Sequence, residues 1–177
     1  MTDELADNLL FQINKYLSTK DLSKAYEDAQ EILRLAPSDP IAYYALAKTK
    51  YFQENYEDCL YLLSKAAELD QRITHVWVLA GYCLIAQRQY QQAQEAFDYT
   101  LSLDENNFEA IFGLFLINLI LLDENKAQHF LERAFSINKS LTIYYTNLFF
   151  QEFFSPSKAL DKTQKEDISI LLKRLAV

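Results

Sequence analysis

Apolar residues recur three and four positions apart along most of the chain, as in the series Ala93, Phe97 and Leu101. Residues at this spacing lie on one face of an α-helix, and that face can pack against a core. The pattern therefore predicts helices rather than strands. The segment from Phe108 to Leu122 is apolar almost all round, with only Glu109 charged. A helix of that kind is covered on all sides, and this one is too short to span a bilayer, which needs roughly 20 apolar residues.

The apolar pattern repeats with a period of 34 residues. Three sets of residues at equal positions in successive repeats, which we call columns, show this period. They are the small residues Ala25, Cys59, Ala93 and Ala127; the large residues Leu35, Leu69, Leu103 and Ile137; and the mixed set Ile32, Ala66, Thr100 and Ala134. We interpret each repeat as two antiparallel helices whose backbones approach closely at the small residues. The large residues are then expected to fill the gap to the next repeat.

The clearest segment reads Trp77, Ala80-Gly81, Tyr90, Ala93 and Phe97. Large, small and aromatic residues at these offsets resemble the tetratricopeptide-repeat (TPR) motif. The resemblance implies an all-α fold, a right-handed α–α superhelix of helical hairpins, as a single TPR domain over residues 1–177. The repeats would cover about 6–39, 40–73, 74–107 and 108–141.

A degenerate fifth unit and a capping helix are expected over 142–177. Tyr145 and Leu148 keep the first-helix pattern of that unit, Ser155-Pro156 should end its first helix, and Asp161 takes the small position. The capping helix is expected near Asp167–Leu175, where apolar residues again follow helical spacing.

Composition supports helices joined by tight polar turns, since the chain has only 2 Gly and 3 Pro. The net charge of -8 opposes binding to phosphates, so we expect no nucleic-acid partner. The first residues show no basic and apolar signal pattern, and no stretch is long enough for a membrane span. We therefore expect a cytoplasmic protein.

Candidate catalytic chemistry is sparse. His75 and His129 fall on different repeats and have no metal or triad spacing with a cysteine or acid. Cys59 and Cys83 fit small buried positions, and no Gly-rich phosphate loop is present. The sequence predicts no enzyme activity, no cofactor and no metal site.

The resemblance also implies a binding groove, because the first helix of each TPR repeat lines the concave surface. In this chain the groove residues would be Leu10, Asn14, Leu17, Tyr44, Lys48, Tyr51, Phe52, Val78, Tyr82, Ile85, Phe112 and Leu116. Leu119, Phe150 and Phe153 would extend the lining, although plain core is an equal interpretation for these three. The lining is apolar and aromatic, which accounts for the 12 Tyr and 12 Phe.

One TPR subfamily binds the C-terminal Glu-Glu-Val-Asp of chaperones through a carboxylate clamp of Lys, Asn and Arg. Only Asn14 matches that clamp here, and the other positions hold Leu10, Ala45, His75 and Leu79. A carboxylate needs cationic partners, so we do not expect this clamp.

The leading hypothesis is a protein-interaction module that binds a hydrophobic peptide or helix of a partner in its concave groove. The chain's own terminal helix, or a second copy in a homodimer, is an alternative occupant. The repeat with Gly81-Tyr82-Cys83 and Gln89-Tyr90 also resembles the class II chaperones of type III secretion, which keep translocators soluble. A constitutive subunit of a larger complex is the remaining alternative.

Overall fold

The computed structural model describes residues 3–149, 151 and 160–175, with side chains from Asn8 onward, and these residues are helical without strands. The helices are α1 (Asp3–Ser18), α2 (Leu22–Leu35), α3 (Pro40–Phe52), α4 (Tyr56–Leu69), α5 (Thr74–Ala86), α6 (Tyr90–Leu103), α7 (Phe108–Ile120), α8 (Glu124–Leu148) and α9 (Lys162–Leu175). No helix among the described residues is long and apolar enough to cross a membrane.

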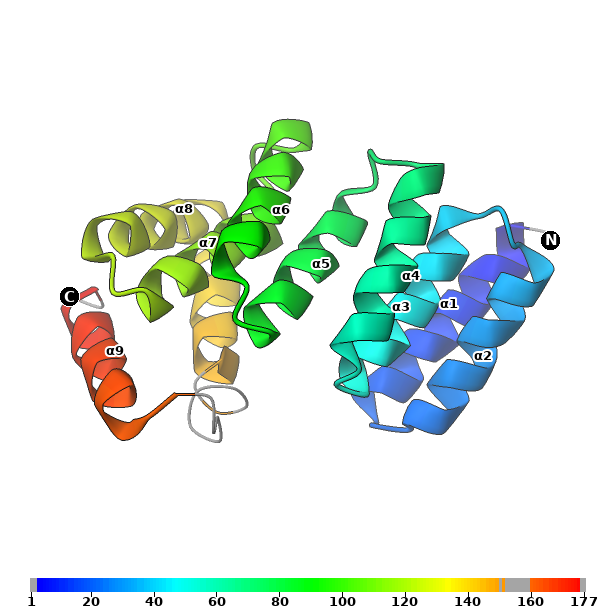
Figure 1. The fold of residues 1–177 in the computed structure, drawn as a ribbon, viewed down its shortest axis with the longest axis horizontal. Helices are drawn as coiled ribbons and strands as arrows, with labels where there is room; N and C mark the ends of the chain where they lie inside the picture. The colour runs from blue at the N-terminus through cyan, green and yellow to red at the C-terminus, as the bar shows by residue number, and fades with distance from the viewer. Residues whose placement is uncertain (1–2, 150, 152–159, 176–177) are drawn as a thin grey trace. The chain divides into compact units, whose positions relative to one another are not determined.

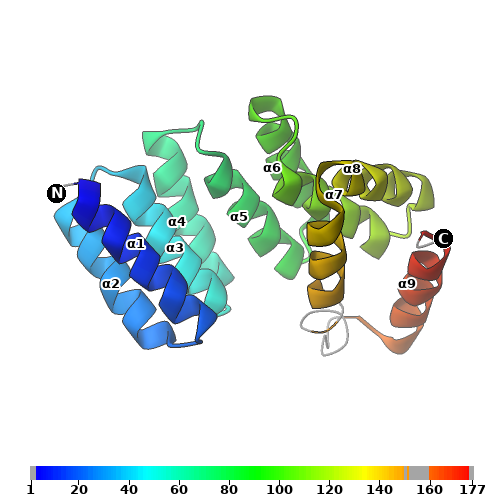
Figure 2. The same cartoon turned by 180° about the vertical axis from the view of Figure 1, so that it is seen from behind.

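The chain divides into two compact units, Met1–Ala96 and Phe97–Val177. In the first unit α1 pairs with α2 and α3 pairs with α4 as antiparallel hairpins, and α5 packs against α4 (Figures 1 and 2). The first helices of successive repeats also touch, α1 with α3 and α3 with α5. In the second unit α7 pairs with α8 and contacts α9. The all-α fold predicted from the sequence is confirmed.

Asp and Asn side chains mark the beginnings of most helices. Each accepts a hydrogen bond from a backbone N–H two or three residues further on, which satisfies a donor that the helix itself leaves unpaired. These capping residues are Asp21, Asp39, Asn55, Asn107 and Asp123. Asp21, Asn55 and Asp123 lie between the two helices of a repeat, and Asp39 and Asn107 lie between repeats, so the helices begin at fixed places although glycine and proline are scarce.

The turn between the two helices of each repeat contains a residue with left-handed backbone, and that residue is never glycine. The four φ angles lie between 59° and 62°, at Lys20, Glu54, Arg88 and Leu122, spaced 34 residues apart. The next residue's N–H bonds to the carbonyl five residues earlier, as from Asn55 to Lys50 at 3.0 Å. This is the Schellman pattern, which usually places glycine at the left-handed residue.

Two of the three sequence columns are buried, the column of small residues as expected. Ala25, Cys59, Ala93 and Ala127 are 0% exposed, and the column from Ile32 to Ala134 is buried throughout. The third prediction was wrong: Leu35, Leu69, Leu103 and Ile137 are 36–47% exposed rather than packed between repeats. The first three are the last residues of α2, α4 and α6, where the chain turns away toward the next helix and leaves the side chain in solvent.

Helix α8 joins the second helix of the fourth repeat to the first helix of the expected fifth unit. A kink at Asn138, with φ -154° and ψ 97°, separates the two parts. Its side-chain oxygen accepts the Leu141 N–H at 2.9 Å, and its carbonyl accepts the Thr142 hydroxyl at 2.8 Å. Asn138 therefore caps the second part and shortens the connection between the repeats.

Helix α9 begins a turn earlier than the sequence interpretation placed it. Asp161 and Gln164 form a reciprocal capping box, with the Gln164 N–H on the Asp161 carboxylate at 2.8 Å and the Asp161 N–H on the Gln164 amide oxygen at 3.0 Å. Asp161, which breaks the column of small residues, thus serves as a helix cap. The expected helix end at Ser155-Pro156 lies outside the described residues.

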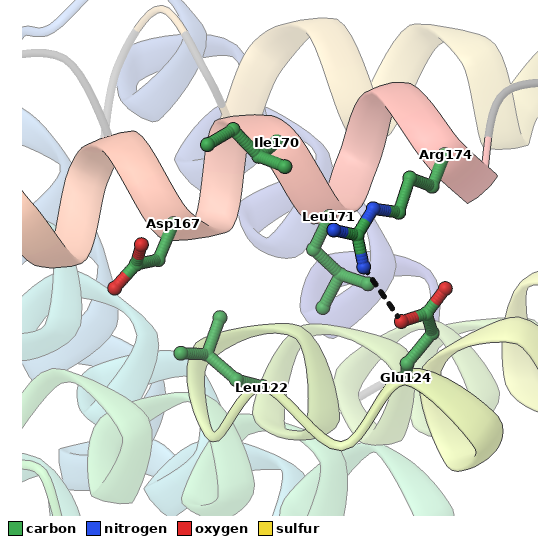
Figure 3. Close-up of a pocket in the computed structure, with 6 residues that line it drawn as sticks. All are labelled: Leu122, Glu124, Asp167, Ile170, Leu171 and Arg174. Carbon is green, nitrogen blue, oxygen red and sulfur yellow. Dashed lines mark hydrogen bonds and ion pairs between the residues drawn. The ribbon is translucent and has the colours of Figure 1, made fainter.

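Ile168 and Leu171 bury the apolar face of α9 in the second unit. Arg174 reaches across to Glu124 at the start of α8, at 3.2 Å (Figure 3). A shallow hollow beside this ion pair is lined by Leu122, Glu124, Asp167, Ile170, Leu171 and Arg174 (Figure 3). Exposed apolar and charged side chains mix there.

Candidate functional site: the inner face of the first unit

Three first helices, α1, α3 and α5, form one continuous face in the first unit, which we call the inner face and define by Asn14, Tyr44, Lys48, His75 and Tyr82. The Lys48 ammonium donates a hydrogen bond to the Asn14 amide oxygen at 2.8 Å and so connects α3 to α1. The Tyr44 and His75 rings lie 6.2 Å apart, tilted by 31°, and connect α3 to α5. Both contacts run between helices that are neighbours in successive repeats, so the inner face is built by the repeat itself.

The period of 34 explains why these particular residues meet. Asn14, Lys48 and Tyr82 occupy the same position in three successive repeats, and equal positions of stacked repeats lie side by side. Tyr44 stands one helical turn before Lys48, and His75 two turns before Tyr82, so each pair shares a helix face. Asn14 and His75 are exposed, whereas Tyr44, Lys48 and Tyr82 are half-buried.

Charge is divided between inner and outer helices of this unit. Helices α3 and α5 contain no Asp or Glu, and α1 contains none from Asn8 onward. The outer helices α2 and α4 carry acids at Glu27, Asp28, Glu31, Glu57, Asp58 and Glu68. A chain of net charge -8 therefore presents an inner face without acidic residues among its described side chains.

Seven of the twelve predicted groove residues keep some surface. Leu10, Tyr44, Lys48, Tyr51 and Tyr82 are half-buried, and Asn14 and Phe52 are exposed. Tyr51 packs edge-on against the rings of Phe52 and Tyr56, each at 5.8 Å, and burial raises the pKa of its hydroxyl. Tyr51 thus faces the core more than the inner face.

The other five predicted groove residues are buried, so they present no surface to a ligand in this structure. They are Leu17, Val78, Ile85, Phe112 and Leu116, with exposures of 1–9%. Periodicity identified the correct helices, but it does not report how deeply each side chain is covered by neighbours distant in sequence.

Helix α7 shows this most clearly, since every residue from Phe108 to Leu119 is buried except Glu109. The Phe112 ring lies 5.9 Å from Phe108, 5.5 Å from Phe115 and 5.6 Å from Tyr145 of α8. Much of the aromatic content of the second unit therefore forms core. Leu119 is also buried, and Phe150 and Phe153 lie outside the described side chains.

The positions of a carboxylate clamp hold no lysine or arginine, and His75, which stands at one of them, packs on Tyr44. Leu10 and Leu79 are half-buried and apolar, Ala45 is buried, and the Asn14 amide oxygen is occupied by Lys48. Lys48, the cation of the inner face, lies outside the clamp positions.

Groups able to do acid–base or metal chemistry are dispersed. His75 packs on Tyr44 and His129 on Phe130. Within the described part of the chain, no group of three His, Cys, Asp or Glu side chains could hold a metal ion. That the protein is not an enzyme remains a prediction of the sequence.

The two cysteines form a pair that the sequence analysis did not anticipate. Cys59 of α4 and Cys83 of α5 are both fully buried, with their Sγ atoms 3.0 Å apart. Their hydrogen bond, together with burial, raises the pKa of the Cys83 thiol. Each cysteine alone fits the interpretation as a small buried hydrophobe, and only the packing of α4 on α5 brings them together.

Antiparallel helix pairs at a constant period, with small buried residues at their contact, define a helical-repeat protein. Comparison with solved structures shows that the particular fold is that of the tetratricopeptide-repeat proteins. The thermophilic TPR protein TTC0263 of Thermus thermophilus is similar with a TM-score of 0.71 and 15% identity, over 80% of each chain. The crystal structure of MamA is similar with a TM-score of 0.63 and 17% identity, over 93% of this chain and 92% of that one.

A third similar structure is the first TPR of Spaghetti (RPAP3) bound to the HSP90 peptide SRMEEVD. Its TM-score is 0.60 with 20% identity, over 69% of this chain and 97% of that one. Among curated proteins, anaphase-promoting complex subunit 3 of Schizosaccharomyces pombe is 23% identical over 135 residues. This chain spans only 20% of that relative's length. No protein-family model matches the sequence.

Proposed function

We propose that this chain is a protein-interaction module and that the inner face of the first unit binds a peptide segment of a partner. The observation that carries the proposal is the cluster of partly open side chains across α1, α3 and α5, which includes Tyr44 on α3 and Tyr82 on α5. The peptide bound to the TPR of RPAP3, a structure similar in fold, supports a peptide as the ligand.

The chemistry of the inner face favours a partner segment with apolar side chains. A tyrosine has a large apolar ring and a polar hydroxyl, which suits a surface that is partly exposed to solvent before binding. Such aromatic anchors often supply most of the affinity at interfaces. The segment would lie as an extended strand or as a helix, the two common ways in which a groove holds a peptide.

Selection from a phage-displayed library of random peptides tests this proposal without a known partner. Selected peptides are synthesised with a fluorophore and their affinities measured by fluorescence polarisation. The double variant Tyr44→Ala/Tyr82→Ala should lose about 2–3 kcal/mol of binding free energy, roughly 30- to 150-fold in Kd. Circular dichroism should show an unchanged helical signal.

Tyr61→Ala is the matched control, because Tyr61 is 63% exposed on the outer helix α4. It removes the same side chain from the opposite side of the hairpin and should leave the affinity unchanged. Equal losses in both variants, or no loss in the double variant, would place peptide binding elsewhere.

A second candidate is a constitutive subunit of a larger complex, which the similarity to anaphase-promoting complex subunit 3 favours. Its apolar surface would then be covered permanently by other subunits or by a second copy. Sedimentation of the purified chain together with binding of an apolar dye would separate the cases. Stable self-association that hides the dye sites supports the subunit, whereas a dye-binding monomer supports the peptide module. The chaperone of type III secretion remains a prediction of the sequence alone.

A further inference from the structure

Lys48 is half-buried and has no carboxylate partner among the described residues. The first unit contains two other half-buried lysines, and both are paired, Lys50 with Asp58 at 3.5 Å and Lys65 with Glu68 at 2.8 Å. Lys15 and Lys20 are exposed, so water solvates them. Lys48 is therefore the cation of this unit that is partly removed from water without a compensating charge.

The surroundings of Lys48 leave its charge uncompensated. The amide of Asn14 that accepts its hydrogen bond is neutral, and the inner helices carry no acid among their described side chains. Removal from water lowers the pKa of the Lys48 ammonium. Burying a charge costs free energy unless an opposite charge lies close to it. A carboxylate that binds beside Lys48 would therefore offset part of the cost of burying its ammonium.

Two donors converge at this point. The Lys48 ammonium has three N–H donors, and one of them bonds to the Asn14 amide oxygen. The other two can donate to a ligand. The amide nitrogen of the Asn14 side chain makes no hydrogen bond within the described residues, and this side chain is exposed. One carboxylate has two oxygens and can accept from both groups.

We propose that the inner face of the first unit selects partner segments that contain an Asp or Glu side chain, whose carboxylate binds Lys48 Nζ and Asn14 Nδ2 while flanking apolar residues pack on Tyr44 and Tyr82. This inference rests on the proposed function and adds the chemistry of the partner. A side chain fits better than a chain terminus, because Lys48 lies on α3, the middle inner helix. A segment that reaches both Asn14 on α1 and Tyr82 on α5 must continue on either side of Lys48.

The test uses the peptides selected by phage display, synthesised with an acetylated N-terminus and an amidated C-terminus so that side chains supply the carboxylates. Each acidic residue is replaced by its amide, Glu→Gln or Asp→Asn, and affinity is measured for the wild-type chain and for Lys48→Met. One replacement should weaken binding to the wild-type chain roughly tenfold and change binding to Lys48→Met less than about twofold. Lys65→Met is the matched control and should behave as the wild-type chain.

Lys48→Met should also melt no lower than the wild-type chain, because methionine fills the space of the aliphatic stem without a buried charge. Weakened binding together with undiminished stability supports a role in recognition rather than in folding.

Two results would overturn the inference, and they differ in what they say of the proposed function. If peptides bind and depend on Tyr44 and Tyr82 but tolerate every amide replacement, the carboxylate site fails and the peptide module stands. If no selected peptide depends on Tyr44 and Tyr82, both fail. If a second synthesis of the same peptides with a free C-terminal carboxylate binds and the amidated peptides do not, the choice of a side chain is overturned.

Discussion

The ring of Phe97 lies directly over Gly113, so close that a Cβ at residue 113 would lie under 3 Å from three of its ring atoms. Both residues belong to the second unit, and the Phe97 side chain is fully buried. The glycine therefore lets α6 approach α7 more closely than any other residue would. We expect Gly113→Ala to destabilise the fold by about 1–3 kcal/mol, because the ring cannot move freely in a packed core.

Urea unfolding followed by circular dichroism measures this loss. The double variant Gly113→Ala/Phe97→Leu tests the cause, since a smaller side chain at 97 makes room for the added methyl group. The two changes should then cost less together than the sum of the single changes. Additive losses would show that the contact with Phe97 is not the reason for glycine at 113.

A second prediction concerns the left-handed residues in the turns of the repeats. Glu54 has φ 59° and is exposed, so its side chain contributes little packing. A residue with a Cβ costs about 1 kcal/mol in this conformation, whereas glycine adopts it freely. Glu54→Gly should therefore stabilise the protein by about 0.5–1 kcal/mol in urea unfolding. Glu54→Ala keeps the Cβ and should show no such gain.

A third prediction concerns the buried cysteine pair. Treatment with diamide, a two-electron thiol oxidant that is reduced to its hydrazine, should join Cys59 and Cys83 with loss of two hydrogen atoms, seen by mass spectrometry. The Sγ atoms need to approach by only about 1 Å from their 3.0 Å separation to reach bonding distance. Closing a loop of 24 residues should stabilise the chain by about 3 kcal/mol.

The rate of this oxidation should rise with pH. The thiolate is the reactive form, and the raised pKa of Cys83 keeps the thiol protonated at neutral pH. Cys59→Ala is the natural control, because the equivalent residues Ala25, Ala93 and Ala127 show that alanine fits this position. If diamide also stabilises Cys59→Ala, the stabilisation does not come from a bond between Cys59 and Cys83.

A fourth prediction separates packing from charge at α9. Leu171 is buried, whereas the Arg174 and Glu124 side chains of the neighbouring ion pair are 63% and 46% exposed. Leu171→Ala should cost about 2–4 kcal/mol of unfolding free energy because it leaves a cavity. Arg174→Ala should cost less than about 1 kcal/mol, because solvent screens an exposed pair. Equal losses in the two variants would mean that α9 is held chiefly by the ion pair.

Much of the fold could be predicted because its determinants are local or recur at one spacing. The period of 34 located the helix pairs, and the small column from Ala25 to Ala127 is buried as expected. Two local signals were present but not used: the Asp161–Gln164 capping box at the start of α9, and Asn138 as a cap within α8. Both are short polar motifs that periodicity alone does not weigh.

The candidate site was predicted less well than the fold. Membership of a first helix follows from periodicity, but exposure depends on every side chain that packs on a residue. Phe112 and Tyr44 occupy the same repeat position, yet Phe112 is buried by Phe108, Phe115 and Tyr145 while Tyr44 stays partly open. The sequence could not distinguish them, because the covering residues belong to other segments.

By itself, the sequence determined the repeat, the helix pairing and the aromatic character of the inner helices, since short-range spacing sets which residues share a helix face. Only the tertiary structure decided that Lys48 lies against Asn14 without a counter-charge, that Cys59 meets Cys83, and that the column ending at Ile137 faces solvent. Each of these depends on the distance between helices and on what covers them. Such quantities arise from packing across the chain rather than from the order of its residues within one helix.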